Sequence, residues 1–179
     1  MKKKLVTEMG RIDREEFAAS DKLPLTVVVD NVRSLHNVGS VFRTSDAFRV
    51  EKVVLCGITA TPPHAEIHKT ALGAEDGVEW SYFDDTVAAV DELKAAGYEV
   101  YAIEQVENSI ALQDFVVESG KRYAVVLGNE VKGVQQQVVD ICDGSIEIPQ
   151  FGTKHSLNVS VTAGMVIWEF ACKSGWVKR

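Results

Sequence analysis

Apolar, β-branched residues gather in short continuous runs along this chain, and the runs predict the strands of a sheet. Three of them, LTVVV at residues 25–29, KVVLC at 52–56 and RYAVVL at 122–127, lack the polar alternation of a half-exposed strand. Such runs are typical of strands that are buried on both faces in a parallel sheet. Residues 78–83 alternate between apolar and polar, which predicts a strand at the sheet edge. The same criteria predict further strands at residues 98–103 and 145–148.

The helical spacing of apolar residues predicts what connects these strands. In residues 84–96, Val87, Val90 and Leu93 recur along one face, and Gly97 supplies a stop signal. The same reasoning predicts helices at residues 38–48, 65–71, 135–141 and 158–173, and a charged surface helix at residues 7–20.

Strands that alternate with helices predict an α/β fold, with a mostly parallel sheet and helices on both faces. Residues 105–115 fit neither pattern, and we expect a loop there with a helical turn at 111–115. No linker, repeat or low-complexity segment divides the chain. We therefore expect one domain over residues 1–179, with a short helical extension over about residues 1–23.

Length and composition narrow the class of protein. The 179 residues suit one compact α/β domain. Cys56, Cys142 and Cys172 form no C-x-x-C pair, and we expect buried thiols in a reducing compartment. No apolar stretch approaches the length of a membrane span, and acidic residues soon follow the basic start MKKK. We expect a cytoplasmic protein with no signal peptide and no membrane contact.

Polar loops follow three of the predicted strands, at the sheet edge where α/β proteins bind ligands. These loops are residues 31–43, 128–133 and 149–158. Each has a structural explanation when taken alone: Asn37 as a helix cap with Arg43 on the surface, Glu130 as a surface carboxylate, and Ser156 and Asn158 as helix caps.

Two features in and directly after these loops are not explained by helix capping or surface exposure alone. Gly128 directly follows a predicted buried strand, where a missing side chain lets a ligand approach the backbone closely. Asn158, Ser160 and Thr162 interrupt an apolar run, and such polar side chains need hydrogen-bond partners if they are buried.

The three loops together resemble a known family. The stretches NVRSLHNVGSVFRTSDAF, VVLGNEVKGV and IPQFGTKHSLNVSVTAG are similar, in order and spacing, to the three motifs of the SpoU/TrmH family of RNA 2′-O-ribose methyltransferases. The resemblance spans roughly residues 26–172, and its motifs are specific in combination. It implies S-adenosylmethionine as cofactor and a ribose 2′-hydroxyl of RNA as the methyl acceptor.

The resemblance also implies roles for individual residues. Arg43 matches the family residue most closely tied to catalysis, near the ribose 2′-hydroxyl and phosphate of the target. Because guanidinium keeps its proton in proteins, we expect electrostatic stabilisation of the developing alkoxide from Arg43. We expect Glu130 to hold Arg43 or Asn37 through a charge-assisted hydrogen bond. Ser156 and Asn158 complete the catalytic set that the resemblance implies.

Gly128, Ile148 and Leu157 are the cofactor-binding residues that the resemblance implies. The chain has no G-x-G-x-x-G fingerprint and no P-loop, so a dinucleotide-type site is not supported. His64 and His68 have the i, i+4 spacing of a metal pair. They have no third ligand and no H-E-x-x-H pattern, and we expect no metal.

The family fold is an α/β sheet with a deep trefoil knot in the C-terminal part, and it works as a homodimer. We therefore expect both features here. The predicted C-terminal helix has more apolar surface than one face needs, which suits either a partner or all-round burial in the monomer. We expect Trp168 to belong to the core of this helix. The apolar residues of this predicted helix include Val161, Met165, Ile167, Trp168 and Phe170.

The net charge of −7 disfavours a dedicated nucleic-acid binder, because contacts with phosphate dominate such affinities. An RNA substrate therefore requires a local basic surface. The chain shows no counterpart of the extra RNA-binding domain of some relatives, and tRNA is slightly favoured over rRNA. The alternatives are a non-catalytic RNA-binding or assembly protein that retains the fold, and a small-molecule α/β enzyme.

Overall fold

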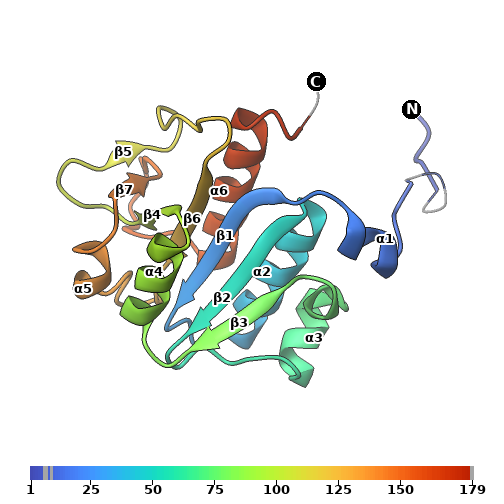
Figure 1. The fold of residues 1–179 in the computed structure, drawn as a ribbon, viewed down its shortest axis with the longest axis horizontal. Helices are drawn as coiled ribbons and strands as arrows, with labels where there is room; N and C mark the ends of the chain where they lie inside the picture. Colours follow the sequence, from blue (N-terminus) through green and yellow to red (C-terminus); the bar gives the residue numbers. More distant parts are fainter. Residues whose placement is uncertain (6–7, 9, 178–179) are drawn as a thin grey trace.

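The computed structural model describes residues 1–5, 8 and 10–177, and one sheet of parallel strands forms its centre (Figure 1). Seven strands lie in the order β3-β2-β1-β6-β4-β7-β5, and every neighbouring pair is parallel. The strands are β1 (Leu23–Asp30), β2 (Val50–Cys56), β3 (Trp80–Phe83), β4 (Tyr98–Ile103), β5 (Ile110–Ala111), β6 (Arg122–Leu127) and β7 (Gly144–Glu147).

The centre of the sheet consists of the three runs that predicted buried strands. Val27 of β1 pairs with Val53 of β2 on one side and with Val125 of β6 on the other. All three side chains are at most 1% exposed, so both faces of these strands are covered. The predicted buried strands are confirmed, and β3 lies at one edge as predicted.

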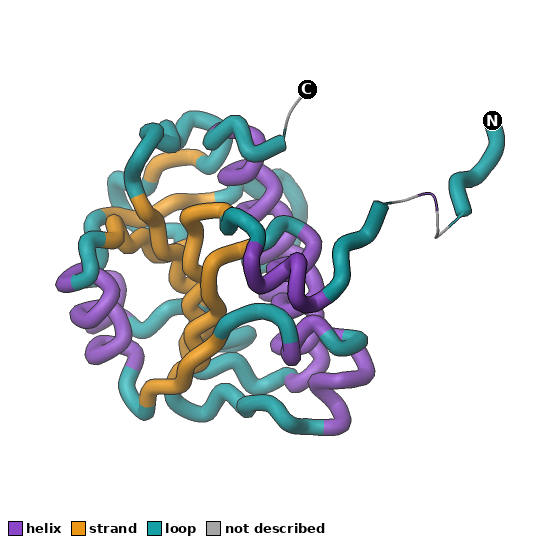
Figure 2. The backbone as a smooth tube through the Cα atoms, turned by 45° about the vertical axis from the view of Figure 1, so that its right-hand side comes forward, coloured by secondary structure: helices purple, strands orange, loops and turns teal. Residues whose placement is uncertain are grey.

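Helices cover both faces of the sheet, because each parallel connection must cross over one face. One core packs β1 and β2 against α2, α3 and α6, and Phe17 of α1 joins it. A second core packs the opposite face against α4 and α5 (Figure 2). The helices are α1 (Arg14–Ala19), α2 (Leu35–Ala47), α3 (Ala65–Ala71), α4 (Thr86–Ala95), α5 (Gln136–Val139) and α6 (Val159–Lys173), with a 3₁₀ turn at Ala74–Asp76.

Helices α2 to α6 begin and end within three residues of the predicted bounds, but α1 is shorter than predicted. The prediction covered residues 7–20, of which 7 and 9 lie outside the described part of the chain. The helix begins at Arg14 because the side chain of Asp13 accepts a hydrogen bond from Glu16 N at 2.8 Å.

The strand β5 was not predicted. Residues 105–115 were expected to be a loop with one helical turn, and the turn is present because Phe115 N donates to Ala111 O at 3.1 Å. Ile110 and Ala111, where this turn begins, form β5 and pair with β7 at the other edge of the sheet. A strand this short has no periodicity that a sequence pattern could reveal.

One side of α6 is apolar and exposed. Val161, Met165 and Trp168 are 53%, 41% and 49% exposed, and their spacing of four and three residues places them on one face. The expectation that Trp168 belongs to the core is therefore wrong; its ring packs edge-on against Phe48, with centroids 5.8 Å apart. Cys172 continues this exposed face, so the expectation of three buried thiols is also wrong.

Burial raises the pKa of the Cys56 thiol to about 12 and that of Cys142 to about 11. Both therefore stay protonated and unreactive at neutral pH. Within residues 1–5, 8 and 10–177, none of the helices has the length and apolar character required to cross a bilayer.

Candidate functional site

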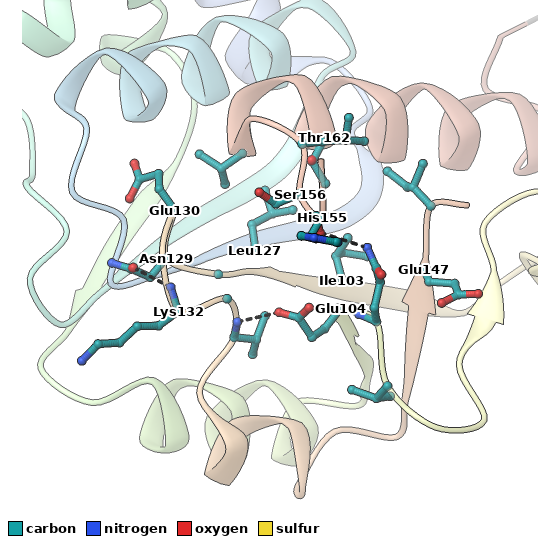
Figure 3. A pocket seen from close by; sticks show the side chains of 18 of the residues that line it. Ile103, Glu104, Leu127, Asn129, Glu130, Lys132, Glu147, His155, Ser156 and Thr162 are labelled. Atoms are coloured by element: carbon teal, nitrogen blue, oxygen red, sulfur yellow. Dashed lines mark hydrogen bonds between the residues drawn. The ribbon is translucent and has the colours of Figure 1, made fainter. Parts of the chain in front are cut away.

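A cavity of about 480 Å³ lies at the carboxyl edge of the sheet. Its walls are the loops that follow β4, β6 and β7, together with the first turn of α6 (Figure 3). This is where ligands bind in open α/β sheets. The lining comprises residues 103–106, 127–134, 136, 139, 146–148, 150, 155–157, 159 and 162.

The loop after β6 folds back on itself beside this cavity. Asn129 and Gly133 form an antiparallel bridge, with Asn129 N donating to Gly133 O at 3.0 Å. The Asn129 side chain stabilises the turn by accepting hydrogen bonds from Val131 N and Lys132 N. It also donates to Asn31 O at 2.7 Å, which joins the loop to the end of β1.

The structure gives a different reason for a glycine at position 128 from the predicted approach of a ligand. A Cβ atom there would lie 2.1 Å from the Gly133 carbonyl carbon and 2.2 Å from Val134 N. The glycine is therefore required because the chain itself passes over it. Gly128 also lines the cavity, but the backbone that approaches it closely belongs to the protein.

Glu130 connects the cavity to the loop before α2. Its Oε2 accepts from Arg33 N and its Oε1 from Ser34 N, both at 3.0 Å. Oε1 also accepts from the side-chain amide of Asn37 at 3.0 Å. The alternative in which Glu130 holds Asn37 is therefore the one observed, and no hydrogen bond joins Glu130 to Arg43 among the described residues.

The hydrogen bonds decide the protonation of Glu130. Burial by itself raises the pKa of this carboxyl group. The hydrogen bonds from the backbone of Arg33, Ser34 and Glu130 itself, and from the Asn37 side chain, outweigh burial and leave the pKa below its usual value. Glu130 is therefore ionised at neutral pH.

Asn37 extends the chain of hydrogen bonds to the third motif. Its Oδ1 accepts from the Asn158 side-chain amide at 3.2 Å. The alternative in which Asn37 caps α2 is wrong, because the cap is Ser34, whose hydroxyl accepts from Asn37 N at 3.3 Å. Since Asn37 lies in the first turn instead, its side chain is available to Glu130 and Asn158.

Asn158 has two structural roles at once. Its Oδ1 accepts from Ser160 N at 2.9 Å and from Val161 N at 3.3 Å, so it caps α6. The capping explanation is therefore correct for Asn158, while Ser156 precedes the cap and lines the cavity. This polar set is not buried: Asn158 is exposed, and the hydroxyls of Ser160 and Thr162 donate hydrogen bonds to it.

The structure separates the predicted site residues into two groups. Glu130, Gly128, Ile148, Ser156 and Leu157 line the cavity. Asn37, Asn158 and Arg43 lie outside the lining, although Asn37 hydrogen-bonds to Glu130 in the lining and Asn158 hydrogen-bonds to Asn37. Arg43 is exposed on α2 and has no hydrogen-bond or ion-pair partner among the described residues.

Two carboxylates at this edge were missed from the sequence. Asp30, at the end of β1, is fully buried and accepts hydrogen bonds from Thr86 Oγ1 at 2.6 Å and from both Gln135 Nε2 and Gln135 N. It anchors the far end of the loop that carries Glu130. Glu104, at the end of β4, lines the cavity. Their position directly after buried strands was the available signal.

The histidine pair on α3 is engaged elsewhere. The His64 ring accepts from Glu66 N at the start of the helix, and His68 Nδ1 lies 2.6 Å from Glu75 Oε1. Among the residues that the structure describes, no group of three or more His, Cys, Asp or Glu side chains is arranged to hold a metal ion.

The sequence and the fold are similar to those of a known protein family. A family model described as the SpoU rRNA Methylase family matches residues 24–168. The tRNA (guanosine(18)-2′-O)-methyltransferase of Thermus thermophilus is 32% identical over 163 residues, which cover 91% of this chain and 82% of that protein. Three other curated relatives, from staphylococci and Neisseria meningitidis, are longer, and the chain spans 57% to 67% of their length.

Solved structures agree with the sequence comparison. The TrmH/SpoU tRNA modifying enzyme of A. aeolicus superposes with a TM-score of 0.76 at 31% identity, covering 89% of this chain and 79% of that one. An AdoMet-bound rRNA methyltransferase from Sinorhizobium meliloti has the same fold, with a TM-score of 0.77 at 24% identity over 85% of this chain and 60% of that one. By its motifs, its parallel sheet and the match over residues 24–168, this chain belongs to the SpoU family of RNA methylases.

Proposed function

We propose that this protein transfers a methyl group from S-adenosylmethionine to a ribose 2′-hydroxyl of RNA. The observation that carries the proposal is the hydrogen-bonded chain Glu130–Asn37–Asn158, which joins all three motifs at the rim of one cavity. The 2′-O chemistry is that named for the Thermus thermophilus relative.

The cavity suits an adenosyl cofactor. Its volume of about 480 Å³ falls within the roughly 300–1,000 Å³ of small-molecule sites. Ile148 and Leu157 offer apolar surface for the adenine, and the backbone after β6 and β7 offers polar groups. When bound, S-adenosylmethionine supplies an electrophilic methyl group on a sulfonium centre.

The residues of this chain contribute position and charge. The ribose hydroxyl releases its proton to water and forms an O–CH₃ bond as the S–CH₃ bond breaks, which leaves S-adenosylhomocysteine as a neutral thioether. Negative charge therefore develops on the ribose oxygen before transfer. The Arg43 guanidinium stabilises that charge and holds the adjacent phosphate. Glu130 and Asn37 set the position of α2, which carries Arg43, relative to the cavity. Holding both reactants in line supplies much of the acceleration.

An RNA substrate also needs basic groups near the cavity, since the chain as a whole is acidic. Arg33, Lys132 and Lys154 are exposed in the three motif loops, and Arg43 is exposed on α2. These side chains offer a local cationic surface. We favour tRNA over rRNA, because the Thermus thermophilus relative, of which the chain covers 82%, is named for tRNA.

We further infer a homodimer that buries the exposed face of α6. Val161, Met165 and Trp168 form a contiguous apolar stripe, and such stripes on a surface helix mark interaction sites. A two-fold interface pairs the same patch on both subunits. The dimer would also bring together two copies of the basic loops.

We infer a trefoil knot in the C-terminal part from the family resemblance. Contacts between the segment after β4 and the C-terminal segment support a knotted C-terminal part. The Lys173 ammonium donates to the carbonyls of Leu112, Gln113 and Phe115, and Gln105 Nε2 lies 3.5 Å from His155 O. We treat residues 1–179 as one domain with the extension at about 1–23. An experimental chain trace through residues 104–173 tests the knot.

Calorimetric titration with S-adenosylmethionine and S-adenosylhomocysteine tests the cofactor. Transfer of labelled methyl into unmodified tRNA and rRNA then tests the reaction. Alkaline hydrolysis locates the label, because a 2′-O-methyl group blocks cleavage of the next phosphodiester and leaves the label in dinucleotides. Label in mononucleotides would mean base methylation. Failure of the folded protein to bind either compound would favour the non-catalytic RNA-binding alternative.

A further inference from the structure

Glu104 is a carboxylate in the cavity wall to which the motifs assign no role. It stands at the carboxyl end of β4, and its backbone is held firmly in place. Glu104 N donates to Ile146 O at 3.2 Å, and the Ser145 hydroxyl donates to Glu104 O at 2.8 Å. The side chain therefore leaves the sheet from a fixed point.

The carboxylate itself is also held. Oε1 accepts from Gln105 N at 3.0 Å, and Oε2 accepts from Val134 N at 2.9 Å (Figure 3). A Cβ atom at Gly133 would lie 2.1 Å from Oε2, so the loop after β6 leaves room for this group. No ion pair joins Glu104 to a cation in the described part of the chain.

Each carboxylate oxygen can accept two hydrogen bonds, and each Glu104 oxygen uses one. Two adjacent acceptor positions thus remain on a fixed carboxylate at the cavity wall. A vicinal diol, with two hydroxyl donors on neighbouring carbons, is the ligand group that fills both. We propose that Glu104 binds the 2′- and 3′-hydroxyls of the cofactor's ribose. This inference rests on the proposed function.

Other parts of the cofactor match this carboxylate less well. A sulfonium centre has no O–H or N–H to donate. The adenine is better served by the apolar surfaces of Ile148 and Leu157. The ammonium group of the amino acid is the remaining competitor, and 5′-methylthioadenosine, which has the ribose but no amino acid, separates it from the diol.

Calorimetry of wild type, Glu104→Gln and the control Glu107→Gln tests the inference. Glu107 is exposed in the same loop after β4 and lies outside the cavity lining. The probes are S-adenosylhomocysteine, its 2′-deoxy and 3′-deoxy analogues, and 5′-methylthioadenosine. Since the Gln amide would face a backbone N–H, Glu104→Gln also perturbs the loop. That perturbation affects every probe alike, so the differences between probes report the diol contact.

For wild type, removal of either hydroxyl should weaken binding about 10- to 100-fold, the range for hydrogen bonds to a charged acceptor. Glu104→Gln should weaken S-adenosylhomocysteine and 5′-methylthioadenosine by a similar factor and the deoxy analogues by little. Glu107→Gln should bind every probe as wild type does.

If Glu104→Gln weakened the binding of S-adenosylhomocysteine and of its deoxy analogues by the same factor, the diol contact would be overturned. Glu104 would then only hold the loop after β6 in position. A loss for S-adenosylhomocysteine that is absent for 5′-methylthioadenosine would assign it to the ammonium group instead. Failure of wild type to bind S-adenosylhomocysteine at all would count against the proposed function, which is a different result.

Discussion

The side-chain amide of Asn37 donates to Glu130 Oε1 at 3.0 Å and so joins the first turn of α2 to the loop after β6, across 93 residues of the chain. The same carboxylate receives two backbone N–H groups from the turn before α2. Glu130 also lines the cavity. The position of α2, and with it Arg43, is therefore tied to the loop after β6 that lines the cavity.

Glu130→Gln should lower the free energy of unfolding by about 1–3 kcal/mol, because an amide NH₂ would face a backbone donor and leave it unsatisfied. Asn37→Ala should remove the shared hydrogen bond, and the double variant should reveal a coupling of about 0.5–3 kcal/mol. Urea denaturation measures all three. Glu107→Gln, an exposed Glu in the loop after β4, should change stability by less than about 0.5 kcal/mol. Strict additivity of the two changes would contradict the contact.

The contribution of Glu130 should depend on pH. Its pKa is lower in the folded protein than the ordinary value of 4.5, so its stabilisation is present above that value and is lost as the pH falls through the folded pKa. The difference in unfolding free energy between wild type and Glu130→Gln should therefore stay constant from neutral pH down to the ordinary value of 4.5 and shrink as the pH falls further. A difference that grows on acidification would show that the hydrogen bonds do not favour the ionised form.

Gly128→Ala should destabilise the protein by about 1–3 kcal/mol, because the new methyl group meets the backbone at Gly133 and Val134. The loop that lines the cavity must then shift, so affinity for S-adenosylhomocysteine should fall as well. Gly152→Ala is the matched control, since a Cβ atom there meets nothing within 4 Å. Thermal denaturation and calorimetry measure both effects, and equal melting temperatures for the two variants would refute the close approach.

Arg43→Ala should reduce methyl transfer about 10²- to 10³-fold, the usual effect of removing a group that stabilises developing charge. Folding and binding of S-adenosylhomocysteine should persist, because Arg43 is exposed and outside the cavity lining. Arg43→Lys keeps the charge but loses the planar fork, so it should recover only part of the rate. Full transfer by Arg43→Ala would remove Arg43 from the proposed site.

Met165→Glu should convert the inferred dimer into a monomer, because it places a charge in the middle of the exposed apolar stripe of α6. Sedimentation equilibrium measures the mass. Ala95→Glu, which adds the same charge at an exposed position of α4, should leave the mass unchanged. Alkylation of Cys172, on the same face as Met165, should be faster in the monomeric variant. A monomeric wild type would refute the dimer.

The sequence by itself determined every strand of the described sheet except β5, and it determined helices α2 to α6 to within three residues. Buried runs such as residues 122–127 and the periodicity of residues 84–96 express local rules, since a strand or helix repeats the same geometry along its own length. The three motifs follow buried strands directly, and parallel strands present such loops at one edge.

The tertiary structure alone decided which groups meet. Glu130 bonds Asn37 and leaves Arg43 exposed, Gly128 makes room for the chain's own backbone, and Trp168 lies on the surface. Asp30 and Glu104 acquire their places only when the loops after β1, β4 and β6 are side by side. Such contacts depend on how crossovers arrange residues that are distant in the chain, and no local pattern encodes that arrangement.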